Sequence, residues 1–255
     1  NEKNSYLKSK NVIKVRNFYL MVEIINFLKK FKISSNQKKI FRLIKMHDKI
    51  FYKQSLFVNN HGGIGYNNSL LIYIFFNHLK LDMILESGVW KGYTTFLFDK
   101  YPKKIKKISF DINLKHLEYV SKKTKYIEDD IINYNFGKIN NFSKTLAFFD
   151  DHVSQYDRLK FSDKLKISFI IFDDDVEFSA VHSDGWPSIP TLSMIISPLK
   201  IKKFSWKSIN KNAHADFRNM KFGKILNKYT YVKAPNISRI TGYYEQSPMS
   251  FLIRK

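Results

Sequence analysis

Two acidic runs that follow two apolar segments are the residues of this chain best suited to chemistry. The strand predicted over 145–149 ends in Asp-Asp-His at 150–152, and the strand predicted over 167–172 ends in Asp-Asp-Asp at 173–175. Both segments are apolar on both faces, as in a parallel sheet, so these side chains emerge together at one sheet edge. Clustered carboxylates raise one another's pKa unless a cation neutralises them, and oxygen ligands suit a hard ion such as Mg²⁺. The pattern predicts a magnesium site; the alternative is that the aspartates merely cap loops and helices.

A glycine turn stands earlier in the chain, after the first strand predicted for the core. The stretch Glu-Ser-Gly-Val-Trp-Lys-Gly at 86–92 joins an apolar run to the helical spacing of 93–98. A sharp turn at the carboxyl end of a parallel strand needs glycine, and it directs the N–H groups of the next helix at a ligand. The turn lacks both the dinucleotide fingerprint G-x-G-x-x-G and the Gly-Lys-Ser/Thr of phosphate loops. An acidic residue two positions before the first glycine suits a cationic ligand such as S-adenosylmethionine; an ordinary βα turn is the alternative.

The turn resembles the first motif of the class I S-adenosylmethionine-dependent methyltransferases. Its Gly-Val-Trp-basic-Gly form is similar to that of the macrocin-type, Mg²⁺-dependent sugar O-methyltransferases. That family carries Asp-Gly-Asp after its fourth strand and Asp-Asp after its fifth. The resemblance implies that Asp150, Asp173 and Asp174 hold Mg²⁺.

Two residues of the acidic runs depart from the family pattern. His152 stands at the position of the family's proposed base, and histidine can take a hydroxyl proton near neutral pH. Asp151 stands where the family has glycine, and it is the second candidate for the catalytic base. Two alternatives stay open: His152 as a further ligand, and a shift by one residue that would make Asp174 and Asp175 the ligand pair.

The resemblance also implies a set of residues that bind S-adenosylmethionine. Asp111, after the strand predicted over 107–110, would hold the ribose diol, and it could also cap a helix predicted over 114–120. Asp130, after the strand predicted over 125–127, would contact the adenine amine; a solvated acidic turn is the alternative. The other implied residues belong to the glycine turn and its helix: Glu86, Gly88, Val89, Gly92 and Thr94.

The order of predicted elements indicates an α/β fold. Strands and helices alternate through the motif region, which favours a Rossmann-like, doubly wound sheet of mostly parallel strands. Strands predicted over 229–233 and 249–253 would form the C-terminal antiparallel hairpin that a class I methyltransferase sheet has. We expect an N-terminal helical extension over 1–55 and a methyltransferase-like domain over 56–255.

Three connecting segments carry weaker expectations. Three glycines and four asparagines at 59–68 predict a loop, which either covers the ligand pocket or is a plain linker. The loop predicted over 177–190 follows the acidic runs, so Trp186 is a candidate to stack on a sugar ring, or it anchors the loop. His214 and Asp216 are assigned to an irregular segment with a structural role.

Composition restricts the partners. The formal net charge is +22. However, lysine, asparagine, isoleucine, phenylalanine and tyrosine are heavily used together, as AT-rich coding produces, so the charge does not by itself indicate nucleic acid. No cysteine is present, so disulfides and thiolate sites are excluded, and a reducing, cytoplasmic setting fits. The apolar runs fall short of a transmembrane segment. Residues 18–31 could lie on a membrane surface or pack on the domain.

These observations predict an S-adenosylmethionine-dependent, Mg²⁺-dependent O-methyltransferase. Its expected acceptor is a hydroxyl of a carbohydrate or of a glycosylated small molecule, because a metal that holds two vicinal hydroxyls suits sugars and catechols. The alternatives are a metal-dependent, cephalosporin hydroxylase-like relative, a nucleic-acid methyltransferase, and a binding domain without catalysis. The Asn-Pro-Pro-Tyr type of motif used on base amines is absent. A homo-oligomer is left open.

Overall fold

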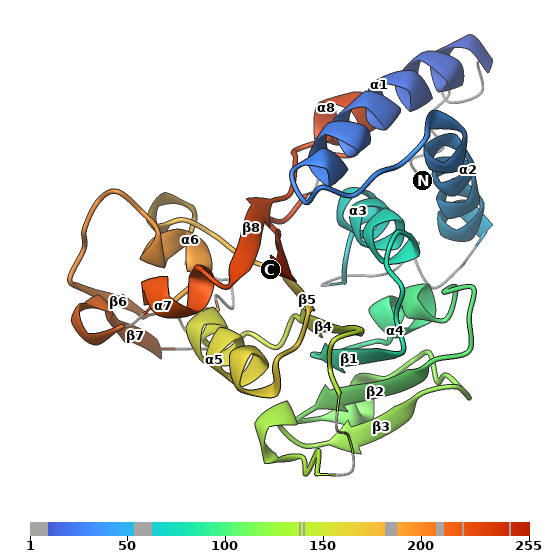
Figure 1. The fold of residues 1–255 in the computed structure, drawn as a ribbon. Helices are drawn as coiled ribbons and strands as arrows, with labels where there is room; N and C mark the ends of the chain where they lie inside the picture. The colour runs from blue at the N-terminus through green and yellow to red at the C-terminus, as the bar shows by residue number, and fades with distance from the viewer. Residues whose placement is uncertain are drawn as a thin grey trace. The chain divides into compact units, whose positions relative to one another are not determined.

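The computed structural model describes the chain in two compact units, one of residues 80–233 with 247–255 and one of residues 1–79 with 234–246 (Figure 1). The described residues are 10–53, 63–137, 139, 141–181, 188–207, 212–220, 222–244 and 246–255. The expected division at residue 55 stays a prediction; by contacts, α3 (Tyr66–Asn77) and residues 234–246 group with the N-terminal helices.

Among the described residues, a seven-stranded sheet runs through the larger unit in the order β3-β2-β1-β4-β5-β9-β8 (Figure 1). The strands β3 to β5 of this order are parallel, and β9 is antiparallel to both of its neighbours. This is the mostly parallel sheet with a C-terminal antiparallel hairpin that the sequence predicts. The strands are β1 (Met83–Ser87), β2 (Lys106–Asp111), β3 (Lys125–Glu128), β4 (Thr145–Phe149), β5 (Phe169–Phe172), β8 (Tyr229–Lys233) and β9 (Ser250–Arg254).

The sheet reverses its winding beside β1. The chain runs from β1 outward to β2 and β3, then returns to β4 on the other side of β1. Ser87 lies opposite Phe149 in the β1–β4 register, so both strands end at the same level. Open α/β sheets bind ligands outside the carboxyl ends of strands at such a reversal. The glycine turn and the first acidic run therefore begin side by side at the expected place for a ligand.

The central strands are buried on both faces. All five residues of β1 and of β4 are buried, including the polar Glu86 and Ser87. On one face, alternate residues of the strands pack with α5 (Gln155–Leu165) in the main hydrophobic core, where Leu85, Phe149 and Leu159 meet. The apolar runs of the sequence thus form interior strands, and the polar residues that follow them emerge at the sheet edge.

The strands of the larger unit are connected by segments that contain short helices and turns. Helix α5 begins after Ser154, whose hydroxyl accepts a 3.2 Å hydrogen bond from the Asp157 N–H, and it ends at Lys166 in the left-handed conformation. The other helices are α4 (Tyr93–Phe98), α6 (Leu192–Ile195) and α7 (Phe222–Leu226). Single 3₁₀ turns lie at Leu114–His116, Ile131–Asn133, Phe178–Ala180 and Phe217–Asn219. A separate antiparallel pair consists of β6 (Lys203–Lys207) and β7 (Asn212–Asp216).

The smaller unit is helical. It contains α1 (Lys10–Lys29), α2 (Gln37–Lys53), α3 and α8 (Ser238–Thr241). Tyr66 to Phe76 of α3 are all buried. The Asn67 side chain donates to the Tyr243 carbonyl at 2.7 Å and accepts from the Thr241 hydroxyl at 2.6 Å. None of the described helices is long and apolar enough to cross a membrane.

Three sequence predictions are corrected by the structure. The helix predicted over 114–120 is a single 3₁₀ turn, because the Glu118 and Tyr119 N–H groups donate to the Lys91 carbonyl of the glycine turn instead. Residues 66–68 belong to α3 rather than to a loop, since partners in the helical unit satisfy the Asn67 amide. His214 and Asp216 lie in β7 rather than in an irregular segment. Residues 59–62 of the predicted loop, and Trp186, lie outside the described residues.

Candidate active site

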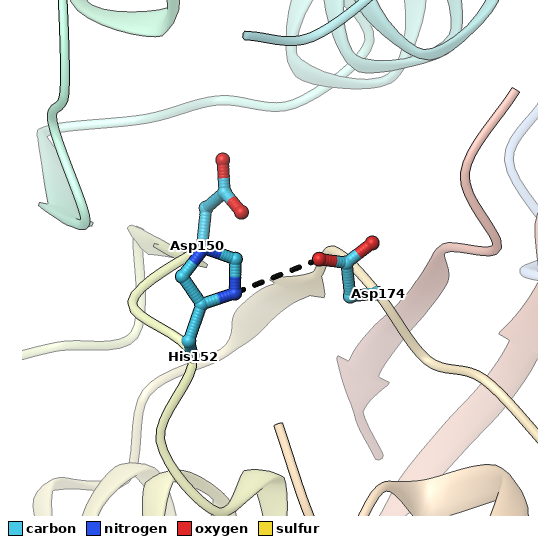
Figure 2. Close-up of side chains that lie close together, drawn as sticks. All are labelled: Asp150, His152 and Asp174. Atoms are coloured by element: carbon cyan, nitrogen blue, oxygen red, sulfur yellow. Dashed lines mark ion pairs between the residues drawn. The ribbon is translucent and has the colours of Figure 1, made fainter. Parts of the chain in front are cut away.

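Asp150, His152 and Asp174 come together at the carboxyl ends of β4 and β5 (Figure 2). One ligand atom from each of the three lies within 4.8 Å of the others. The His152 Nδ1 stands 3.6 Å from an Asp174 carboxylate oxygen, and the two side chains are 39% and 31% exposed. Two acidic oxygens and one imidazole nitrogen thus converge at a place that solvent can reach.

The backbone of this group is held in an unusual conformation. His152 has φ of 54° and Asp174 has φ of 53°, both in the left-handed region that residues other than glycine seldom adopt. The Asp150 N–H donates to the Ser87 carbonyl at 2.8 Å, and the Asp175 N–H donates to the Pro248 carbonyl at 2.8 Å. The end of β1 and the segment before β9 therefore hold these two loops, and strain of this kind persists only where surrounding structure holds it.

The carboxylates of this edge repel one another. Burial raises the pKa of Asp150 well above its ordinary value, and the charges of Asp173 and Asp174 raise it further. Burial and the Asp173 charge also raise the pKa of Asp174 to about 7. A divalent cation fits these residues, because its charge would relieve the repulsion between their carboxylates.

Asp173 and Asp175 differ in their partners. Asp173 is buried, and one of its oxygens accepts a 2.6 Å hydrogen bond from the Ser247 hydroxyl. Asp175 is also buried, and it accepts from the Ser193 N–H and from the Tyr231 hydroxyl, each at 2.7 Å. Asp175 therefore holds the fold together. These contacts disfavour Asp175 as a ligand, and the choice between the pair Asp173 with Asp174 and the pair Asp174 with Asp175 stays a prediction.

Asp151 points away from this cluster, toward a buried arginine. One Asp151 oxygen accepts from the Ser87 hydroxyl at 2.5 Å and from Arg158 Nε at 2.8 Å. The Arg158 side chain is only 3% exposed, and its other nitrogens reach Asp130 at 2.8 and 3.0 Å. Burial acts to raise the pKa of Asp130, but the hydrogen bonds from Arg158 and from the Ile132 N–H, together with the Arg158 charge, hold it below its ordinary value. One guanidinium thus joins the loop after β3 to the loop after β4.

The glycine turn is tightly packed. Gly88 has φ of 88°, and a Cβ atom there would stand 2.2 Å from the Asp150 carbonyl oxygen. One Asp111 oxygen accepts from the Val89 and Trp90 N–H groups at 2.7 and 3.1 Å. The other Asp111 oxygen accepts from the Asn113 N–H at 3.0 Å. The glycine turn therefore lies between the end of β2 and Asp150, the first aspartate predicted to bind a cation.

The remaining predicted cofactor residues lie around this turn. Gly92 also has positive φ, 87°, and precedes α4. Val89 and Thr94 are buried. Glu86 is 1% exposed, and its Oε2 accepts from the Thr95 and Ser109 hydroxyls at 2.5 and 2.6 Å. Its Oε1 is buried and has no hydrogen-bond partner among the described residues. Glu86 lies beneath the turn rather than at its surface.

Sequence reasoning missed two kinds of supporting residue. Arg158 is one of the buried residues of α5, together with Gln155, Leu159 and Ser162. A charged residue on the apolar side of an amphipathic helix is the sequence feature that could have indicated this role. Ser247 reaches Asp173 from a segment distant in sequence, and nothing in the local pattern indicates this contact.

Comparison with solved structures agrees with this arrangement. The chain matches a candidate O-methyltransferase from Klebsiella pneumoniae at a TM-score of 0.51 and 15% identity, covering 91% of this chain and 96% of that one. It also matches an O-methyltransferase from Bacillus cereus, solved with SAH, at a TM-score of 0.50 and 10% sequence identity. That match covers 91% of this chain and 97% of the Bacillus cereus chain. The chain has the class I methyltransferase fold.

A third structure of this methyltransferase fold, a candidate caffeoyl-CoA O-methyltransferase from Staphylococcus aureus, matches at 0.50 and 16%, covering 84% of this chain and 98% of that one. Three CmcI structures match at TM-scores of 0.34 to 0.38, where the alignment spans 50 to 64% of their length, a likeness too partial to carry an argument. No protein-family model matches the chain, and no curated protein matches it in sequence.

Proposed function

We propose that this protein is an S-adenosylmethionine-dependent O-methyltransferase whose acceptor is held beside a divalent cation. The observation that carries the proposal is the convergence of Asp150, His152 and Asp174 next to the glycine turn of a methyltransferase-type sheet. The proposed acceptor is a carbohydrate or glycosylated small molecule with vicinal hydroxyls, and the proposed setting is the cytoplasm.

The residues present fit S-adenosylmethionine. Asp111 is partly exposed at the end of β2. A carboxylate has about four lone-pair positions, and three N–H groups contact Asp111, so it can still accept from a ribose hydroxyl. Glu86 and Gly88 shape the turn from beneath. When bound, S-adenosylmethionine supplies an activated methyl group, and the protein has chiefly to align the acceptor oxygen and take its proton.

The donor set also fits a divalent cation. We propose Asp150 and Asp174 as ligands, with Asp173 as the third carboxylate of the site. The cation would supply positive charge that orients the acceptor and lowers the pKa of its hydroxyl. Carboxylates suit Mg²⁺ and Mn²⁺, whereas an imidazole favours transition metals, so both ions belong in the test.

His152 is the proposed proton acceptor. It is partly exposed beside Asp174, whereas the carboxylate of Asp151, the other predicted base, already accepts from Ser87 and Arg158. If His152 is instead a ligand, His152→Gln will weaken cation binding. As a base, the same variant keeps cation affinity and loses turnover, with kcat lower by 10²-fold or more.

Calorimetric titration tests the proposal. We expect wild type to bind S-adenosylmethionine and Mg²⁺ or Mn²⁺, and Asp150→Asn to lose cation binding while keeping the cofactor. Asp157→Asn, an exposed carboxylate of α5, is the matched control and should keep both. Methyl transfer to a panel of sugars and catechols then identifies the acceptor. Absence of S-adenosylmethionine binding in wild type would contradict the methyltransferase assignment.

A further inference from the structure

The amino ends of the parallel strands form a lysine-rich surface. The residues just before β1, β2, β3 and β4 line two adjoining hollows of about 600 and 720 Å³, which share residues 103–106. We call this surface the basic edge. Its lysines are Lys80, Lys103, Lys104, Lys106, Lys107, Lys122, Lys123, Lys125 and Lys144.

The charge of the basic edge exceeds the bias of the chain. The whole sequence has 44 basic and 22 acidic residues, two to one. The lining of the two hollows has nine lysines and two aspartates, Asp82 and Asp99. Asp99 is bound to Lys107, Tyr119 and Ser121, and Asp82 contacts Lys144 at 3.5 Å. No ion pair among the described residues uses Lys103, Lys104 or Lys106.

The basic edge lies at the opposite end of the strands from the candidate active site. The first residues of β1 and β4 are Met83 and Thr145, while the glycine turn and Asp150 follow their last residues. Strands of four to six residues separate the two edges by roughly 13 to 20 Å at about 3.3 Å per residue. Phosphates held at the basic edge therefore lie at the opposite edge of the sheet from the proposed methyl-transfer site.

We propose that the basic edge binds double-stranded nucleic acid through its phosphates. Lysine is a point-charge donor to phosphate, and contacts with phosphates supply affinity without sequence recognition. A protein partner fits poorly, since interfaces between proteins are depleted in lysine and rich in aromatic side chains. The concave lining also fits a protruding phosphate backbone better than a flat bilayer.

The lining favours a duplex over a single strand. Single strands are held largely by stacking of bases on aromatic side chains. The only aromatic residue in the described lining is Tyr101, which is buried. Contact through phosphates alone favours the duplex, which carries one charge per roughly 1.7 Å of axis.

Fluorescence anisotropy with a labelled 20-base-pair DNA duplex, without cofactor, tests the proposal at 50 to 200 mM NaCl. The variant replaces Lys103, Lys104, Lys122 and Lys123 with glutamine; the control replaces four exposed lysines of α1 and its end, Lys10, Lys14, Lys29 and Lys30. Both remove the same charge. We expect the variant to bind at least tenfold more weakly than wild type at 50 mM NaCl. We also expect log K to fall less steeply with log salt, with a slope smaller in magnitude by about 2 to 4, at roughly 0.9 per lost phosphate contact. The control should stay within about threefold of wild type.

Equal losses in the two variants would overturn the proposal, because the binding would then follow net charge alone. No duplex binding by wild type, or tighter binding to a single-stranded 20-mer or to phosphatidylserine vesicles, would also overturn it. A far-UV circular dichroism spectrum and a thermal midpoint that match those of wild type show that the lysine variant is folded, so this test does not depend on the proposed function.

Discussion

At the scale of single residues, the carboxylates near the carboxyl ends of the strands differ in whether the protein neutralises them. Asp130 and Asp151 share Arg158, and Asp175 accepts from Ser193 and Tyr231. Burial raises the pKa values of Asp150 and Asp174, and the charges of neighbouring carboxylates raise them further. The first group holds the loops of this edge together, and the second contains the aspartates that we propose as cation ligands.

Glu86 should make stability depend on pH. Burial raises its pKa from 4.5 to about 7, although hydrogen bonds from Ser109 and Thr95 act in the opposite direction. Between these values the folded protein keeps a proton that the unfolded chain releases, so the free energy of unfolding falls as pH rises through this window. Urea denaturation with EDTA measures the free energy of unfolding at each pH. We expect its decrease between pH 5 and 7.5 to be smaller in Glu86→Gln than in wild type, by on the order of 2 kcal/mol. Identical pH profiles would show that Glu86 is not the titrating group.

Arg158 should be a major contributor to stability. Arg158→Met leaves Asp130 and Asp151 without their shared cation in a buried setting, which costs about 3 to 5 kcal/mol. Thermal and urea denaturation measure the loss. Arg218→Met is the control, since Arg218 pairs with Asp216 in the open and its removal should change stability little. Similar losses in the two variants would contradict the bridging role.

At the scale of elements, the glycine turn and the loop after β4 form one packed layer. The Gly88 N–H donates to the Phe110 carbonyl at 2.9 Å, and Asp111 at the end of the same strand accepts from the turn. The Asp150 backbone is bonded to Ser87. The two loops proposed to hold cofactor and cation are therefore fixed to each other through β1.

Gly88 should not tolerate a side chain. Gly88→Ala places a Cβ against the Asp150 carbonyl at a positive φ, so we expect a loss of about 2 to 4 kcal/mol and weaker binding of both ligands. Gly223→Ala is the matched control: it lies in α7, and nothing stands within 4 Å of its added methyl. It should leave binding unchanged and stabilise by about 0.5 to 1 kcal/mol. Denaturation and calorimetry measure both, and normal ligand binding by Gly88→Ala would contradict the packed layer.

At the scale of the whole larger unit, charge is separated along the strands. Carboxylates gather at the carboxyl ends, and lysines gather at the amino ends. Each edge concentrates charge of one sign, which is unfavourable until a partner of the other sign binds. The proposed cation site and the proposed phosphate-binding surface therefore lie at opposite edges of one sheet.

Divalent cations should therefore stabilise the protein. Binding only to the folded state adds about 2.7 kcal/mol at a hundredfold excess over Kd, or roughly 5 to 10 °C in Tm for a chain of this size. We expect this rise with Mg²⁺ or Mn²⁺ at constant ionic strength. Asp174→Asn should abolish the rise and increase Tm in EDTA, since it removes a repelling charge. A variant that still responds fully to the cation would exclude Asp174 from the site.

The sequence predicts the strands and loops that carry the site better than it predicts the contacts between those loops. The period of apolar residues places β1 and β4, and the residues just after these strands are then fixed at the carboxyl edge. The helix predicted over 114–120 does not form, because the Lys91 carbonyl takes the N–H groups of Glu118 and Tyr119. The outcome at these positions depends on a partner more than 25 residues away, which no local pattern contains.

The sequence by itself determined the mostly parallel sheet, the glycine turn and the acidic runs, because strand burial and turn geometry depend on neighbouring residues. Only the tertiary structure decided which of these carboxylates form ion pairs or hydrogen bonds within the protein. Arg158 forms ion pairs with Asp151 and Asp130. Asp175 accepts hydrogen bonds from Ser193 and Tyr231. Asp150, His152 and Asp174 lie together at the edge. The reason is physical: the state of a charge depends on its burial and on partners brought from distant segments, and folding sets both.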